Sequence, residues 1–198
     1  MRTTAGGVDD TCRGSQTDEM ASTTLIVLLR GINVGGHAKL PMAQLREIGE
    51  GIGLEEVRTY IQSGNLVATT SLAPATVAER LRVAIEEATD LDVPIIVRTA
   101  AQWRDVIGSN PFPGAASIGK TLHVAFLDGA APDELVGFDA SDFAPEEVAV
   151  RGSEVYLHLP DGIGRSKLAI KLNRLPGASA GTARNWNTVL KLAELAGV

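Results

Sequence analysis

Four short segments of the sequence combine glycine with Arg, Lys, Asn, Gln or Ser and carry almost no acidic residues. Glycine lets a backbone approach a ligand closely, and the other side chains offer cationic groups and hydrogen-bond donors. Such groups are suited to holding an anion, for example a phosphate or a carboxylate. The sequence therefore predicts an anion-binding site, although each segment also has a purely structural interpretation.

The first segment, RGINVGGHAKLP at residues 30–41, contributes Arg30, Asn33, His37 and Lys39. A helix is expected to follow it, and the unpaired N–H groups of a helix start would add to an anion site. The glycine spacing matches neither the dinucleotide fingerprint nor the P-loop, so the segment identifies no nucleotide motif. The structural alternative is a glycine-rich connector whose basic groups point to water.

The second segment, TYIQSGN at residues 59–65, contributes Gln62, Ser63 and Asn65 and is expected to be a hairpin turn. In a split βαβ sheet the first two strands run parallel, so this turn and the first segment leave the sheet at the same end. The polar side chains of the two segments are therefore expected to lie close together. Turn chemistry alone is the alternative interpretation of Ser63.

The third segment, GIGRSKL at residues 162–168, places Arg165 and Lys167 at the start of an expected helix that Ser166 would cap. A glycine loop that leads into a basic helix start suits phosphate or carboxylate. Basic residues continue at helical spacing beyond this segment. A solvated basic stripe on an amphipathic helix is therefore the alternative interpretation.

The fourth segment, TARNWNTVLKL at residues 182–192, contributes Arg184, Asn185 and Asn187 in the first turns of an expected final helix. Thr182 fits the N-cap of this helix. The tryptophan and the aliphatic residues after it recur at helical spacing, which predicts a buried anchor. Arg184 and Asn187 lie on another side that packing does not explain, so they are expected to hold a planar acceptor.

Hydrophobic periodicity and turn residues predict the elements that position these segments. Strands are expected at residues 25–29, 57–61, 66–70, 93–98, 121–127, 148–150 and 155–159. Helices are expected to begin at Pro41 and Pro74, to surround Trp103, and to span residues 132–138, 166–175 and 184–196. This order is typical of an α+β protein with two ferredoxin-like (split βαβ) subdomains. The second subdomain is expected to be incomplete, without a clear final strand and ending in two helices.

A break rich in Pro and Gly, SNPFPGAAS, divides the chain. We expect a disordered tail at residues 1–23, a first ferredoxin-like subdomain at residues 24–108 and a second α+β subdomain with basic C-terminal helices at residues 109–198. The tail lacks the features of a signal peptide, and Met20 opens a better-formed start than Met1.

The chain has a formal net charge of −6, unevenly distributed. Residues 162–198 hold six Lys and Arg against Glu194 alone, whereas residues 128–161 hold nine carboxylates against Arg151. Net acidity disfavours general nucleic-acid coating, and the asymmetry indicates a basic binding end or two regions that attract each other. No apolar run approaches the roughly 20 residues of a membrane span. The single cysteine, Cys12, favours a reducing cytoplasm.

Metal, cofactor and acid–base chemistry find little support in the sequence. His37, His123 and His158 have neither histidine-pair spacing nor a cysteine partner, so we predict no metal site and no cofactor. His123 and His158 are expected at a strand surface. Adjacent glutamate pairs point apart, and no nucleophile elbow occurs, so no assembled catalytic set is predicted.

Taken in order, the motifs of the chain resemble those of a known family. LLRGINVGGHAKLPMAQLREI, VRTYIQSGNLV, GIGRSKL and TARNWNTVLKL are similar to the bacterial family known as domain of unknown function 1697. The resemblance covers about residues 25–198. It implies an α+β fold of two ferredoxin-like subdomains, and it implies no established activity, substrate or cofactor.

The function that these observations favour is binding of a phosphate-bearing or other anionic ligand, such as a nucleotide or a nucleic-acid segment. The alternatives are a protein-interaction or assembly module, including a homo-oligomer, and an enzyme of unidentified reaction type. The leading prediction depends on convergence: Lys39, Gln62, Lys167 and Arg184 must surround one positively biased cleft.

Overall fold

The structure is a computed structural model that describes residues 22–34, 38–175 and 181–198. Its elements follow the order β-α-β-β-α-β-α twice, and we call these runs the first unit and the second unit. The first unit consists of β1 (Thr23–Leu29), α1 (Met42–Gly51), β2 (Glu55–Tyr60), β3 (Asn65–Thr70), α2 (Pro74–Thr89), β4 (Ile95–Thr99) and α3 (Ala100–Gly108). The second unit consists of β5 (Leu122–Phe126), α4 (Asp133–Val136), β6 (Glu147–Arg151), β7 (Glu154–His158), α5 (Lys167–Leu172), β8 (Thr182–Asn185) and α6 (Trp186–Ala196).

Each unit contains a four-stranded antiparallel sheet, and the two sheets share one strand order. The order is β2-β3-β1-β4 in the first unit and β6-β7-β5-β8 in the second. Their registers also agree, because Ile26 of β1 pairs with Arg98 of β4 and Val124 of β5 pairs with Arg184 of β8. In both units the residue after this arginine caps the next helix. Positions in β1 and β5 can therefore be matched residue by residue.

Strand β8 corrects the prediction for the end of the chain. The sequence predicted one helix at residues 184–196, capped by Thr182, and no final strand. Instead, β8 completes the second sheet and α6 begins after it, with the Asn185 side chain accepting a hydrogen bond from the Thr188 N–H at 2.9 Å. A strand of four residues is too short to show its period of two beside a strong helical pattern. The second unit is therefore complete.

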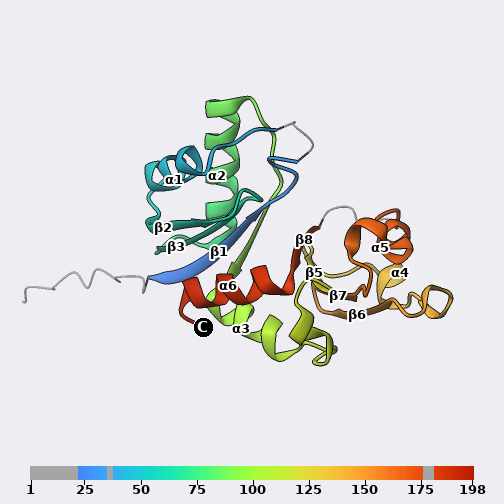
Figure 1. Cartoon of the computed structure of the whole chain (residues 1–198). Coiled ribbons are helices and arrows are strands. Elements are labelled where there is room, and N and C mark those ends of the chain that lie inside the picture. The colour runs from blue at the N-terminus through green and yellow to red at the C-terminus, as the bar shows by residue number, and fades with distance from the viewer. Residues whose placement is uncertain (1–21, 35–37, 176–180) are drawn as a thin grey trace, which may run out of the picture.

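The two faces of the first sheet bury different apolar residues. Leu25, Val27 and Leu29 of β1 belong to a core with α1 and α2, which cover one face of the sheet (Figure 1). Ile26 and Leu28 belong to a second core that also contains residues of β5, α3 and α6. This alternation explains the continuous apolar run of β1, because a strand covered on both faces buries every side chain.

Helices α3 and α6 pack against each other between the two sheets. Trp103 of α3 stacks on Phe126 of β5, with ring centroids 4.8 Å apart, and its Nε1 donates to the carbonyl of Val189 in α6 at 3.0 Å. Trp186 is buried in the same core, as its spacing predicted. Figure 1 shows α6 running beside β1 and α3. The two units thus share an apolar core.

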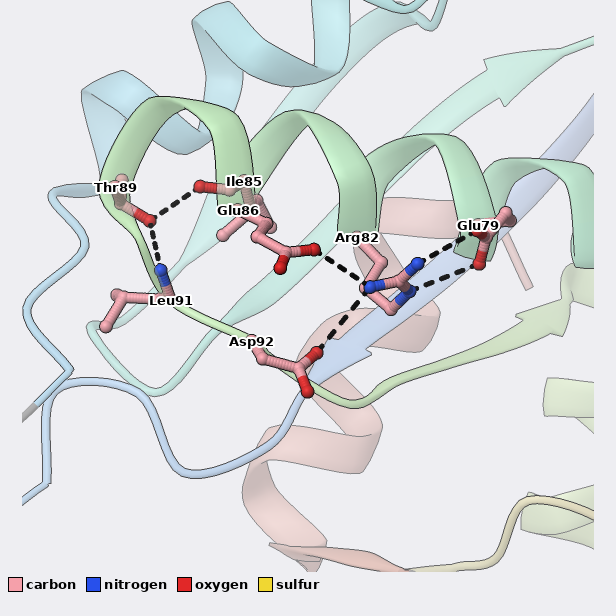
Figure 2. Close-up of polar contacts among 7 residues, drawn as sticks. All are labelled: Glu79, Arg82, Ile85, Glu86, Thr89, Leu91 and Asp92. Atoms are coloured by element: carbon pink, nitrogen blue, oxygen red, sulfur yellow. Dashed lines mark hydrogen bonds and ion pairs between the residues drawn. The ribbon is translucent and has the colours of Figure 1, made fainter.

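The outer surface of α2 carries a cluster of ion pairs (Figure 2). Arg82 lies 2.9 Å from Glu79, 3.1 Å from Glu86 and 3.7 Å from Asp92. Arg82 donates hydrogen bonds to the Glu79 carboxylate, and these bonds, together with the negative charge of Glu79, are the main reason that the pKa of Arg82 is raised. Solvent screens exposed ion pairs, so each of these pairs adds little to stability. The pair between Arg82 and Asp92 connects α2 to the segment before β4.

Two predictions about chain organisation fall at the edges of the described elements. Residues 1–21 of the predicted tail lie outside the described residues, and β1 already includes Thr23. The division predicted after residue 108 falls at the end of α3 and stays a prediction. In the described part of the chain, no helix has both the length and the apolarity needed to cross a membrane.

Candidate functional site

A cavity of about 440 Å³ lies beside α5, where the second sheet meets the first unit. Strands β5, β7 and β8 contribute its floor, α4 and α5 contribute its walls, and the loop after β1 closes one end. Small-molecule sites typically occupy roughly 300–1,000 Å³. The lining residues in the described chain are Arg30, Gly31, Ala125, Leu127, Leu135, Val155, Leu157, Ile163, Ala169, Ile170, Leu172, Asn173, Gly181, Thr182 and Ala183.

The cavity exists because the second unit carries small residues where the first carries larger ones. By the shared register, Ala125 of β5 corresponds to Val27 of β1, and Ala183 of β8 corresponds to Val97 of β4. The covering helix is also shorter, with six residues in α5 against sixteen in α2. Protein interiors are normally close-packed. The second unit therefore leaves open a volume that the first unit fills.

The polar residues of the described lining are Arg30, Asn173 and Thr182, and no described lining residue is acidic. Arg30 is half-buried, and within the described residues its guanidinium has no hydrogen-bond or ion-pair partner. Thr182 pairs with Phe126 of the core between the units, so its side chain lies on the opposite face of the sheet from Ala183, and its hydroxyl accepts a hydrogen bond from Arg184 Nη1 at 2.7 Å. Arg30 is thus the cationic residue of the described lining.

Arg30 lines the end of the cavity that faces the first unit, because it directly follows β1. Arg184 Nη2 donates to the carbonyl of Leu29, the neighbour of Arg30, at 2.8 Å, while its Nη1 reaches Thr182. The Arg184 guanidinium therefore connects the backbone beside Arg30 to β8. The end of the cavity that faces the first unit is its positive end, because Arg30 belongs to it.

Arg184 itself is buried, with 7% of its surface exposed, and it binds the two units together. Its Nε donates to Asn65 Oδ1, its Nη1 to Thr182 and the Ala183 carbonyl, and its Nη2 to three carbonyls of the first unit, those of Leu29, Ser63 and Gly64. Burial lowers the pKa of Arg184 to about 10, so it stays protonated at neutral pH. We call this arrangement the Arg184 clamp. The sequence predicted that Arg184 would donate to a ligand, whereas its N–H groups donate to oxygen atoms of the protein itself.

Asn33 and Asn65 also bind the protein's own backbone. Asn33 Nδ2 donates to the carbonyls of Leu40 and Gln62 at 2.9 and 2.8 Å, and its Oδ1 accepts from the Leu40 N–H. The contact with Gln62 confirms that the first two segments meet at one end of the sheet. The hydrogen bond from Asn33 to Gln62 holds the loop after β1 against the turn between β2 and β3.

The turn itself is held by the fully buried Asn65. Its Nδ2 donates to the Tyr60 carbonyl at 3.0 Å and to Ser63 Oγ at 2.9 Å, while its Oδ1 accepts from Arg184. Both ends of the amide group are therefore occupied. Ser63 accordingly contributes turn chemistry, which was the alternative interpretation of that residue.

A second arginine also connects the two units, but it extends from the first unit to the second, whereas Arg184 extends from the second to the first. Arg98, at the position in β4 that matches Arg184 in β8, donates to Glu154 at 2.9 Å and to the Leu127 carbonyl at 2.7 Å. A smaller hollow of about 260 Å³ beside this pair is lined by both basic and acidic side chains. It therefore lacks the positive bias of the larger cavity.

The third segment has no open helix start. Ser166 is buried and accepts a hydrogen bond from the Ala169 N–H at 2.8 Å, so its predicted capping role is confirmed. However, the Glu146 carboxylate accepts from the Leu168 N–H at 2.9 Å and occupies the place predicted for an anionic ligand. Glu146 lies 22 residues away in the sequence, so no local pattern indicates it.

Of the predicted ligand-binding residues in the described chain, Arg30 alone lines the cavity. Asn185 caps α6, and His37 lies outside the described residues. The remaining predicted residues with exposed side chains are Lys39, Gln62, Arg165, Lys167 and Asn187. Lys39, Gln62, Lys167 and Arg184 therefore do not surround one cavity within the described residues. The first, second and fourth segments do converge, but through contacts that hold the protein together.

Sequence reasoning missed His123, which was expected at the surface and is 7% exposed. Its register partner Asn185 corresponds to Thr99 in the first unit, so His123 occupies the position of the core residue Leu25. Its Nδ1 is buried and has no hydrogen-bond partner in the described residues, and burial lowers its pKa. The correction follows from β5, whose two faces are both covered. Thr182 and Asn173 were also missed as lining residues.

Metal binding finds no site in the part of the chain that the structure describes. No group of three or more His, Cys, Asp or Glu side chains there is arranged to hold an ion. Among the described histidines, His158 pairs with Glu147 at 2.9 Å and His123 lies apart on the other face of the sheet.

Comparisons with known proteins give a family and a fold. A family model described as "Protein of unknown function (DUF1697)" matches residues 22–156. A similar solved structure is that of the conserved bacterial protein SP0830 from Streptococcus pneumoniae, with a TM-score of 0.73 and 23% sequence identity. The similarity covers 89% of this chain and 99% of that protein, and it shows a shared fold. No curated protein matches the chain.

Proposed function

The chain belongs to the DUF1697 family of proteins of unknown function, and we propose that it binds a small anionic molecule in the cavity between its two units. The anionic group would contact Arg30 at the end of the cavity that faces the first unit. The rest of the molecule would lie against the second sheet and α5. The proposal keeps the predicted class of ligand and replaces most of the predicted residues.

One observation carries the proposal: Arg30 is a half-buried cation that has no side-chain partner among the described residues, in a cavity whose described lining contains no acidic residue. A cation in a partly desolvated place attracts a counter-ion more strongly than one in water. The Arg184 clamp, on the other face of β8, adds a second positive charge, and its contacts within the described residues include no carboxylate. Both charges favour an anion at this end.

Substituting Arg30 with glutamine tests the proposal, with Arg104→Gln as the matched control because Arg104 is exposed on α3. Inorganic phosphate, AMP, benzoate and decanoate are added separately, and the melting temperature is recorded. A ligand at about a hundredfold its Kd stabilises the folded state by about 2.7 kcal/mol. At least one anion should raise the Tm of the wild type and of Arg104→Gln, but not that of Arg30→Gln. If every anion leaves the wild-type Tm unchanged, or the shift survives in Arg30→Gln, the proposal fails.

The finer classification of the fold is also proposed. The split βαβ order of elements and the strand order common to both sheets support a ferredoxin-like class for each unit. A cytoplasmic location, an assembly role and an enzymatic role remain predictions, because no contact among the described residues favours any of them.

A further inference from the structure

The geometry of the cavity points to a particular class of ligand: a monocarboxylate with an aliphatic body. Its carboxylate would accept hydrogen bonds from Arg30, and its hydrocarbon part would lie between the alanines of the sheet and α5. This inference rests on the proposed function and narrows it. Three features of the lining support it.

The first feature is the apolar character of the cavity beyond its polar end. Aliphatic residues form most of the described lining, and no aromatic residue contributes to it among the described residues. Ile163 and Ile170 line the cavity and are 42% and 53% exposed, although most large aliphatic residues here are buried. An aliphatic ligand would remove this apolar surface from water.

The second feature is the small number of polar groups. Arg30 presents a planar fork that matches one carboxylate with two parallel hydrogen bonds. The other polar side chain that the described lining offers to a ligand is the amide of Asn173. A nucleotide would place a base edge, ribose hydroxyls and phosphate oxygens in this cavity with few partners, and unpaired buried polar groups are costly. Base recognition also commonly uses aromatic stacking, which this lining lacks.

The third feature is the floor, whose depth depends on two alanines. Ala125 and Ala183 are directly opposite each other in the sheet, at the positions where the first unit has Val27 and Val97. Methyl side chains leave a slot above the sheet that accepts hydrocarbon and offers no hydrogen bond. A larger side chain at either position would fill the space that the hydrocarbon part of the ligand would occupy.

Calorimetric titration tests the inference with decanoate, its uncharged analogue decanol, and AMP, all below micelle-forming concentrations. Decanoate should bind the wild type and Arg104→Gln. Its affinity should fall by about tenfold or more in Arg30→Gln and in Ala125→Leu, and decanol should bind the wild type at least about tenfold more weakly than decanoate. Ala125→Val, which reproduces the residue of the first unit, provides a milder filling variant should Ala125→Leu fold poorly.

Each outcome separates this inference from the proposed function. If AMP or phosphate binds in an Arg30-dependent manner and decanoate does not, the proposed function stands and the monocarboxylate class is wrong. If decanoate binds equally well to wild type, Arg30→Gln and Ala125→Val, it binds elsewhere and the inference is overturned. If no anion of any class binds the wild type, both proposals fail together.

Discussion

The helix-covered face of the first sheet is filled, whereas the same face of the second sheet has a smaller apolar core and a cavity of about 440 Å³ beside it. The sheets share strand order and register, yet Leu25 and Val27 of β1 have His123 and Ala125 as counterparts in β5. The features common to both units are the strand pairings, the capped helices α3 and α6, and the crossing arginines. The difference teaches that this common plan holds the units together, while the side chains under each covering helix determine whether a unit is packed or can accept a ligand.

The largest expected effect comes from removing the Arg184 clamp, which belongs to the common plan. Arg184→Ala removes the donor that the carbonyls of Leu29 and Ser63 and the Asn65 Oδ1 share, whereas the Gly64 carbonyl keeps the Leu29 N–H, and each buried group left unsatisfied costs about 1–3 kcal/mol. We expect the free energy of unfolding to fall by about 3–5 kcal/mol in urea titrations. The exposed control Arg104→Ala should change it by about 0.5 kcal/mol or less. A loss below about 1 kcal/mol in Arg184→Ala would show that water replaces the clamp.

An exchange of the matched residues should produce an intermediate effect in one unit and a small one in the other. Val27→Ala removes buried carbon atoms from a filled core and should cost about 2 kcal/mol. Ala125→Val adds the same atoms to a hollow face and should change stability by about 1 kcal/mol or less. Chemical unfolding of both variants measures the asymmetry. A destabilisation by Ala125→Val that equals or exceeds the one caused by Val27→Ala would contradict the idea that only the second unit has space under its covering helix.

The smallest expected effect concerns the pH dependence introduced by His123. Because burial lowers the pKa of folded His123, the unfolded chain binds more protons than the folded chain as pH falls below about 6.5, and the protein loses stability there. His123→Leu, which restores the residue type of the first unit, should remove this part of the pH dependence and raise stability at acidic pH. Urea unfolding at a series of pH values measures it. His123→Gln should also reduce the slope, and a slope unchanged in both variants would rule His123 out as its source.

Most elements of the fold could be predicted because local signals mark them. Pro41 and Pro74 mark the starts of α1 and α2, and the turn before Asn65 separates β2 from β3. Strand β8 could not be predicted in the same way, because its four residues acquire their conformation by pairing with β5. The helical pattern of α6 therefore extended too far toward the N-terminus.

The candidate site was predictable only in part. Arg30 was found because it stands in a glycine-rich loop, and the described lining of the cavity, which contains no acidic residue, agrees with the charge pattern of that loop. Glu146 capping α5 and Arg184 reaching Leu29 involve residues 22 and 155 positions apart, and such contacts leave no local signature. The alanines at positions 125 and 183 become informative only once the register of the two sheets is known.

The position of α6 late in the sequence has a consequence for how the protein folds during its synthesis. Ile26, Leu28 and Trp103 lie in a core that α6 helps to cover, although α6 follows nearly the whole chain in order of synthesis. A nascent polypeptide in which only the first unit has been synthesised would therefore expose the apolar face of β1 that contains Ile26 and Leu28 until α6 has left the ribosome. Shortened chains that end before Trp186 should consequently recruit chaperones or precipitate.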